Sequence, residues 1–210
     1  MPKFIQEREH IYRLRIPFFS VYTSVFLVAL EDGYILMDCA TTREDVEEYI
    51  LPALQKKGIS PDEVRYLVVS HRHEDHAGGL AWLQEYCKNA ETVTAVRPLA
   101  EGVQTYPMAG HTPDSIGLLD LRSGTLISAD GIQGHGVGIY RCSTHGEGAY
   151  LDTLARVGGD GRILNILFSH AYEPWYRDHA FGREAIGACL RDSLDYIIKR
   201  RMKNESDRDQ

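Results

Sequence analysis

The sequence lacks the features that would tie it to a membrane or to an oxidising compartment. Its four cysteines, among 210 residues, lie far apart and form no Cys-x-x-Cys pair. Such usage is typical of unpaired thiols in a reducing compartment. The apolar run Val25–Leu30 is too short to span a bilayer, and residues 1–14 carry charges throughout, unlike a signal peptide. We therefore expect a cytoplasmic protein with no membrane partner.

Excess positive charge is also lacking. The chain has 30 acidic and 23 basic side chains, which gives a net charge of −7. A negative surface repels the phosphate backbone, so a nucleic-acid partner is disfavoured and a small-molecule substrate is expected. No repeat, low-complexity segment or Pro/Ser-rich linker interrupts the chain. We expect one domain over residues 1–204 and a disordered polar tail over 205–210, with no indication of the oligomeric state.

Strand and helix patterns interleave along the whole chain. Two β-rich runs, Val21–Leu30 and Tyr34–Asp38, flank the turn Glu31–Gly33 and predict a hairpin. Apolar periodicity predicts further strands over 66–69, 92–96, 116–121, 125–129 and 163–168, and helices over 42–57, 79–88, 147–157 and 183–199. This order favours a mixed α/β (α+β) protein in which two sheets carry helices on their outer faces.

The strand predicted at 66–69 leads directly into the run His71-Arg72-His73-Glu74-Asp75-His76. Four potential metal ligands therefore occur within six residues. Three imidazoles and a carboxylate this close together would be costly if they were dry and unpaired, but they suit a borderline-soft divalent cation. The run predicts a metal site at the end of this strand, in preference to packed or surface histidines.

Three more residues of ligand type stand alone at loops or strand ends. His111 lies in a Gly-His-Thr-Pro sequence, Asp130 follows the strand predicted at 125–129, and His170 follows the one predicted at 163–168. Polar residues at the ends of apolar strands are presented by a rigid scaffold at the rim of its sheets. Each could be structural by itself, but the repeated placement favours a shared site.

The ordered set resembles the metallo-β-lactamase fold superfamily. It comprises His71-x-His73-x-Asp75-His76, Gly78-Gly79, Gly110-His111-Thr112-Pro113, Asp130 and His170. It is most similar to the branch that contains glyoxalase II and the lactone hydrolases. The resemblance covers about residues 21–170 and implies a four-layer αββα sandwich, with the site along one edge of the two sheets. It also implies that Asp38 supports the site from behind the metal ligands.

By this resemblance, seven ligands divide between two metal ions, which we expect to be zinc, with iron or manganese as alternatives. The first ion would be held by His71, His73 and His111, the second by Asp75, His76 and His170, and Asp130 would bridge both. Two dications that share a water lower its pKa, and the resulting bridging hydroxide attacks a polarised carbonyl. Asp75 would orient this nucleophile or move a proton. The expected activity is hydrolysis of an ester, thioester or lactone.

Residues 131–148 are the predicted substrate loop. The candidate residues there are His135, Tyr140, Arg141 and His145. Tyr140 is expected to donate to the oxyanion and Arg141 to bind an anionic group. An ordinary surface loop is the alternative. Tyr172, two residues after His170, is a similar candidate.

Departures from related families narrow the expected activity. β-Lactamases of this fold commonly have Cys or Ser in place of Asp130, and flavodiiron relatives have Glu in place of His73, so both activities are disfavoured. Glyoxalase II has a basic residue after a glycine that follows the bridging aspartate, whereas Ile139 follows Gly138 here. This disfavours glutathione thioesters as substrates.

Two alternatives of other classes stay open. The first is a mononuclear iron oxygenase of the same fold, such as a persulfide dioxygenase, which metal analysis and oxygen consumption would distinguish. The second is a non-enzymatic module that kept the scaffold. The presence of all seven expected ligands argues against the second alternative.

Overall fold

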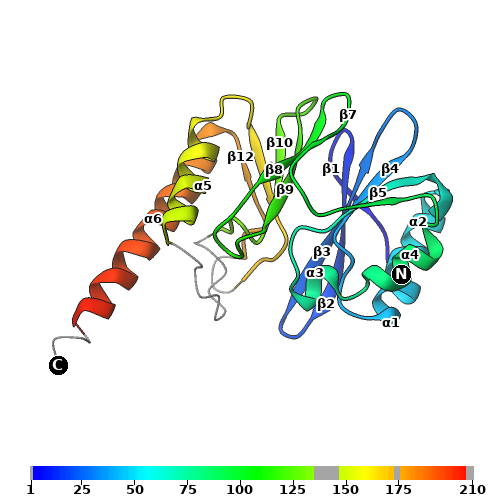
Figure 1. Cartoon of the computed structure of the whole chain (residues 1–210), viewed down its shortest axis with the longest axis horizontal. Helices are drawn as coiled ribbons and strands as arrows, with labels where there is room; N and C mark the ends of the chain where they lie inside the picture. Colours follow the sequence, from blue (N-terminus) through cyan, green and yellow to red (C-terminus); the bar gives the residue numbers. More distant parts are fainter. Residues whose placement is uncertain (1, 135–146, 173–175, 207–210) are drawn as a thin grey trace. The chain divides into compact units, whose positions relative to one another are not determined.

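The computed structural model describes residues 2–134, 147–172 and 176–206. The chain divides into two compact units, residues 1–104 and 105–210. Within these described residues, twelve strands form two six-stranded sheets, and helices accompany both sheets (Figure 1). The mixed α/β class and the two sheets expected from the sequence are confirmed. The single-domain organisation over 1–204 stays a prediction.

The first sheet has the strand order β1-β2-β3-β4-β5-β6. Its strands are β1 (Ile5–Arg8), β2 (Ile11–Phe18), β3 (Val21–Ala29), β4 (Tyr34–Met37), β5 (Val64–Val68) and β6 (Glu91–Val93). The predicted hairpin is confirmed, because β3 and β4 pair antiparallel. β4, β5 and β6 run parallel. β6 is shorter than the predicted 92–96, since its partner β5 ends at Val68, opposite Val93.

Strands β1 and β2 were not predicted from the sequence. The apolar pattern of β2 is interrupted by Arg13 and Arg15, which hides a strand from a periodicity argument. Arg13 is nonetheless fully buried. It forms an ion pair with Glu7 at 3.0 Å and lies over the ring of Phe26 at 4.9 Å. The long apolar stem and the paired guanidinium let this cation occupy a core position.

The helix predicted at 42–57 is present in three parts, α1 (Arg43–Asp45), the π-helical turn η1 (Val46–Ile50) and α2 (Leu51–Lys56). Thr42 and Asp45 form a capping box at its start. Pro52 has no N–H and its ring crowds the preceding turn, which accounts for the widened turn just before it. The shorter elements of this unit are η2 (Pro61–Glu63), α3 (Glu74–Ala77) and α4 (Leu80–Tyr86).

The second sheet has the order β12-β11-β10-β9-β8-β7. Its strands are β7 (Pro98–Ala100), β8 (Val103–Pro107), β9 (Ile116–Asp120), β10 (Thr125–Ala129), β11 (Asn165–Phe168) and β12 (His179–Phe181). The strands predicted at 116–121, 125–129 and 163–168 are confirmed as β9, β10 and β11. Strands β7, β8 and β12 were not predicted from the sequence; the three-residue strands β7 and β12 are too short to show a period of two.

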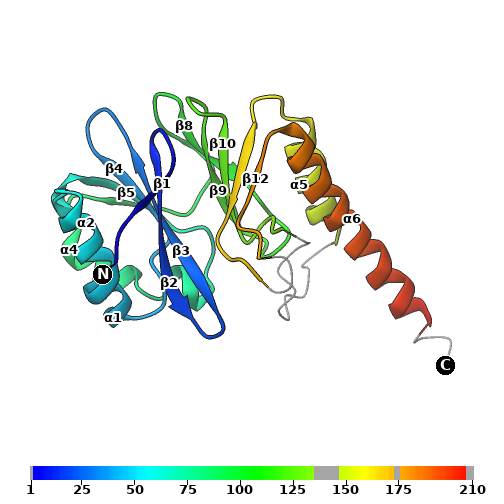
Figure 2. The same cartoon turned by 180° about the vertical axis from the view of Figure 1, so that it is seen from behind.

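Two long helices, α5 (Glu147–Gly159) and α6 (Arg183–Ser206), accompany the second sheet. They lie side by side, and α6 continues well past the end of α5 (Figure 2). Tyr150 and Leu154 of α5 share a buried cluster with Ile186 of α6 and with Phe168 of β11. Both predicted helices are confirmed, and α6 extends to Ser206. No helix in the described part of the chain is long and apolar enough to cross a membrane.

Candidate metal centre

In the first unit, four residues of ligand type lie where β5 leaves the sheet and α3 begins. His71 precedes α3, His73 is the residue before its first turn, and Asp75 and His76 lie inside it. His71, Asp75 and His76 are buried, whereas His73 is exposed. Thr23 of β3 donates a hydrogen bond from its hydroxyl to the Asp75 carbonyl at 3.0 Å. The ligand run is therefore fixed to the sheet by its own backbone.

The two glycines that follow this run permit a close approach of two backbone segments. A Cβ atom at Gly78 would collide with the Thr41 carbonyl, and one at Gly79 with the Cys39 carbonyl. The segments are joined by hydrogen bonds from the Cys39 N–H to the His76 carbonyl at 2.7 Å and from the Gly79 N–H to the Ala40 carbonyl at 3.2 Å. This contact brings the end of β4, with Asp38, against the histidines.

Asp38 is fully buried and orients two histidines of the run. Its carboxylate accepts hydrogen bonds from the Ser70 N–H at 2.8 Å, from the Ser70 hydroxyl at 3.0 Å and from Nδ1 of His76 at 2.8 Å. Because the Ser70 hydroxyl donates its proton to Asp38, it accepts from Nδ1 of His71, 3.0 Å away. Nδ1 therefore carries the proton in both rings, and both Nε2 lone pairs are left for another partner.

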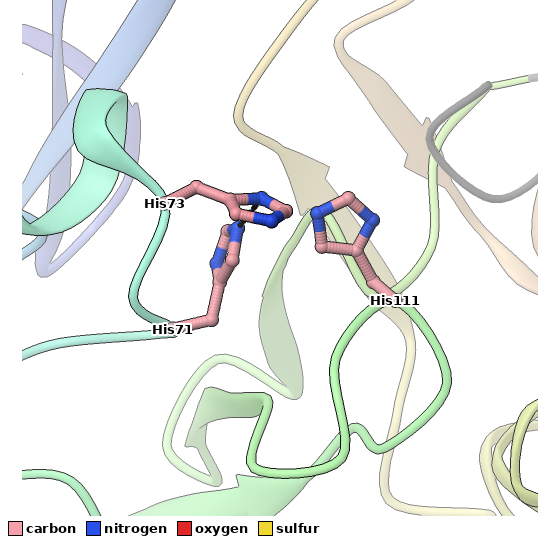
Figure 3. A group of neighbouring side chains, drawn as sticks. All are labelled: His71, His73 and His111. Atoms are coloured by element: carbon pink, nitrogen blue, oxygen red, sulfur yellow. Dashed lines mark hydrogen bonds between the residues drawn. The ribbon is translucent and has the colours of Figure 1, made fainter. Parts of the chain in front are cut away.

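The Nε2 atoms of these two histidines each face a second ligand atom. His71 Nε2 lies 2.9 Å from Nδ1 of His73, the contact drawn as a dashed line in Figure 3. His76 Nε2 lies 3.2 Å from Oδ2 of Asp75. A lone pair that faces a carboxylate is repelled unless a proton or a cation lies between the two atoms. These converging donor atoms suit a cation with a preference for imidazole nitrogen and carboxylate oxygen.

In the second unit, His111, Asp130 and His170 are all buried. His111, also labelled in Figure 3, lies on the loop between β8 and β9. Asp130 and His170 follow β10 and β11, which are parallel neighbours and end at the same edge of the sheet. The two carboxylate oxygens of Asp130 face different rings. Oδ1 lies 3.2 Å from Nε2 of His170, and Oδ2 lies 3.5 Å from Nε2 of His111.

The backbone is strained at the two strand ends that lead to Asp38 and Asp130. Ala129, which directly precedes Asp130, has φ +48°, and Asp38 itself has φ +68°. The left-handed region costs a residue with a side chain roughly 1 kcal/mol or more, so the surrounding structure must enforce it. In both places the strain turns the chain sharply out of a strand, which sets the direction of the carboxylate.

The predicted substrate residues have a mixed outcome. Tyr172 packs near His170, with ring centroids 5.2 Å apart. His135, Tyr140, Arg141 and His145 lie outside the described residues, so their expected roles stay predictions. The sequence analysis missed Ser70 and Thr23. The position of Ser70 directly before the histidine run was a usable signal, whereas nothing local distinguishes Thr23.

A model of the Metallo-beta-lactamase superfamily matches residues 20–177 of the chain. The chain belongs to this superfamily. It is thus an enzyme of a superfamily of metal-dependent hydrolases, and its described residues include histidine and aspartate groups that could hold a metal ion. The more specific resemblance to glyoxalase II and the lactone hydrolases stays a prediction. No curated protein matches the chain.

Solved structures of metallo-beta-lactamases share the fold. One from Hirschia baltica is 15% identical with a TM-score of 0.70, over 91% of this chain and 97% of that protein. One from Pseudomonas aeruginosa, in a mono-zinc form, is 15% identical with a TM-score of 0.72, over 93% and 96%. One from Erythrobacter litoralis is 21% identical with a TM-score of 0.66, over 91% and 96%. At these identities the likeness concerns the fold alone.

Proposed function

We propose that the two ligand groups form one dinuclear zinc centre and that the protein hydrolyses a small ester, thioester or lactone. In this assignment His71, His73 and His111 hold one ion, and Asp75, His76 and His170 hold the other. Asp130 bridges the two. The donor set of imidazole nitrogens and carboxylate oxygens matches the preference of zinc. The mono-zinc form of the related enzyme from Pseudomonas aeruginosa also favours zinc over iron or manganese.

The observation that carries this proposal is the placement of the Asp130 carboxylate. Each of its oxygens faces a different histidine, His170 at 3.2 Å and His111 at 3.5 Å. The proposal assigns these two histidines to different ions. A carboxylate that bound a single ion through one oxygen would not need its second oxygen close to another imidazole ring. The arrangement therefore favours a bridging role.

Two bound zinc ions would supply an activated water and an electrophile for the substrate carbonyl oxygen. The chain's own residues then have distinct tasks. Asp38 and Ser70 hold the Nδ1 protons of His76 and His71, which keeps both Nε2 atoms available as ligands. Asp75 would orient the attacking water or take its proton; its position beside His76 Nε2, 3.2 Å away, supports its assignment to the same ion. The proposed donor to the oxyanion is Tyr140, on the sequence alone.

The substrate class follows from the charge and from position 130. A net charge of −7 favours a small-molecule substrate over nucleic acid. The aspartate at position 130 argues against β-lactams as the main substrates, since β-lactamases of this fold commonly have Cys or Ser there. We also propose a cytoplasmic location, on the cysteine usage.

The first test is metal stoichiometry by elemental analysis, on full-length protein purified without a histidine tag. A panel of ester, lactone and thioester substrates is assayed on the same preparation, with and without a chelator. We expect two zinc ions per chain and hydrolysis that the chelator abolishes and added zinc restores. One iron per chain, together with oxygen uptake, would replace this proposal with the mononuclear oxygenase alternative.

A further inference from the structure

His111 differs from the other proposed ligands in the support of its loop. It lies between β8 and β9, and the turn that follows it is closed by its own side chains. The Ser115 hydroxyl accepts from the Thr112 N–H at 3.1 Å and lies 2.8 Å from the Thr112 hydroxyl. These bonds shape the turn after His111. Two further contacts precede His111, on the segment Ala109–Gly110, and join the loop to helix α5.

Helix α5 supplies the first of these contacts. The hydroxyl of Thr153 donates a hydrogen bond to the Ala109 carbonyl at 2.7 Å. Thr153 is fully buried, and Ala109, which accepts the bond, is half-buried. Without the hydroxyl, the Ala109 carbonyl would lose its bond to α5 and would pair with water or with another donor, because backbone carbonyls are rarely left unpaired. The bond therefore fixes the backbone two residues before the imidazole.

The second contact is a close approach of Gly110 to Tyr150, one turn earlier on α5. Gly110 has φ +147°, and a Cβ atom there would lie 2.6 Å from Cδ2 of Tyr150 and 2.9 Å from both its Cα and Cβ. Cα and Cβ belong to the rigid part of the helix and cannot rotate away. Tyr150 is fully buried and belongs to the apolar cluster that α5 forms with α6 and β11. Gly110 is therefore held directly against α5.

We propose that Thr153 is a positioning residue for the metal ligand His111, and that α5 sets the affinity of the zinc ion that His111 holds. The inference rests on the proposed function. Thr153 does not touch the metal; it acts through the Ala109 carbonyl, and the Gly110–Tyr150 contact holds the same segment against the same helix. Groups that orient metal ligands from outside typically alter metal affinity ten- to a hundredfold. Because Thr153 acts through two backbone units, the lower end of that range is expected.

The test compares Thr153→Val with Thr153→Ser in the full-length protein. Valine keeps the shape of threonine and removes the hydroxyl, whereas serine keeps the hydroxyl. Zinc affinity is measured by competition with a chelating dye, and thermal unfolding is measured on the metal-free protein. We expect T153V to bind one of the two zinc ions about tenfold more weakly, with the other ion little changed. T153S should restore the affinity to within about twofold of the wild type.

Thr125→Val is the matched control. Thr125 is also a fully buried threonine of this unit, and its hydroxyl bonds with Ser123 at the end of β10 that lies away from Asp130. A purely structural role for Thr153 would make T153V behave like T125V, with a lower unfolding temperature and unchanged zinc affinity, and that result would overturn the proposal. If T153V does not fold, Thr153→Ala takes its place. Wild-type protein that binds no zinc would instead refute the proposed function itself.

Discussion

The two groups of ligands are built in different ways. In the first unit, four proposed ligands lie within six residues at one strand–helix junction. A buried carboxylate and a serine hydroxyl orient two of the histidines through hydrogen bonds to Nδ1. In the second unit, the three proposed ligands come from three separate loops that lie far apart in the sequence. Their support comes from parallel strand ends, a strained residue and the packing of α5.

The difference predicts which changes each group tolerates. A ligand oriented through its ring proton depends on the charge and donor pattern of one neighbour. A ligand oriented through its backbone depends on helix packing and on the loop conformation. Changes of charge without change of shape should therefore harm the first group most, and changes of packing should harm the second. Asp130 lies outside this contrast, since the proposal makes it the one residue that serves both ions.

Replacing that shared residue should have the largest effect. Asp130→Ala removes both oxygens that face His111 and His170. We expect zinc content to fall below two ions per chain and turnover to fall by more than the roughly hundredfold that outer ligand-orienting groups cause. Elemental analysis and the hydrolysis assay measure both. Asp120 is another buried carboxylate of the same sheet, and the Asp120→Ala variant should retain its zinc. Normal dinuclear occupancy in D130A would remove the bridging assignment.

A change of donor pattern in the first group comes next. Asp38→Asn keeps the shape of the side chain but can present an N–H₂ donor to His76. Nδ1 of His76 must then accept, so the proton moves to Nε2 and blocks that atom as a ligand. We expect zinc affinity to fall ten- to a hundredfold, measured by dye competition.

The control for this variant is Asp45→Asn in the same unit. The Asp45 carboxylate accepts from the backbone N–H groups of Thr41 and Thr42 and contacts no histidine in any described bond. The Asp45→Asn variant should be less stable, because its helix cap is weakened, and its zinc affinity should be unchanged. Equal zinc affinity in D38N and the wild type would show that Asp38 has no orienting role.

The contrast between the groups also explains how much of the site could be predicted from the sequence. The run from His71 to His76 could be found from residue types alone, because all four ligands follow one apolar strand. His111, Asp130 and His170 were each ambiguous by themselves; their repeated placement favoured a shared site, and the family resemblance assigned them to it. The supports of the ligands were harder still. Thr153 lies more than forty residues from His111, and its role depends on how α5 packs.

The fold shows the same limit. Strands with a clean apolar pattern, such as β9 and β10, were predicted with nearly correct bounds. β2 was missed because Arg13 is buried in an ion pair that a hydrophobicity pattern counts as polar. β7 and β12, with three residues each, gain their pairing from neighbours distant in sequence, which no local pattern contains. Long-range pairing and buried polar contacts are therefore the parts that the sequence did not reveal.

The smallest expected effect concerns the helix that supports His111. Asp160, just after α5, accepts bonds from Nε and Nη2 of Arg162 at 2.8 and 2.6 Å, and from the Tyr106 hydroxyl of β8 at 3.3 Å. The Arg162 side chain holds the pKa of Asp160 down at about 2, from an ordinary value of 3.8. Since the folded-state pKa is the lower one, this carboxylate stabilises the fold above about pH 4, and the contribution is lost as the pH falls toward 2.

Asp160→Asn should therefore lower the free energy of unfolding at pH 7 by about 1 kcal/mol, a figure reduced for solvent screening of the partly exposed Arg162. Urea unfolding measures this free energy. The metal-free protein is used, because acid would otherwise release zinc and change the stability by itself. The gap between D160N and the wild type should close between pH 4 and pH 2. Asp152→Asn, exposed on α5, should change stability by less than about 0.5 kcal/mol at either pH. If the difference in unfolding free energy between D160N and the wild type stays constant down to pH 2, Asp160 acts through its shape and not through its charge. The end of α5 would then be held by packing, as the His111 loop is.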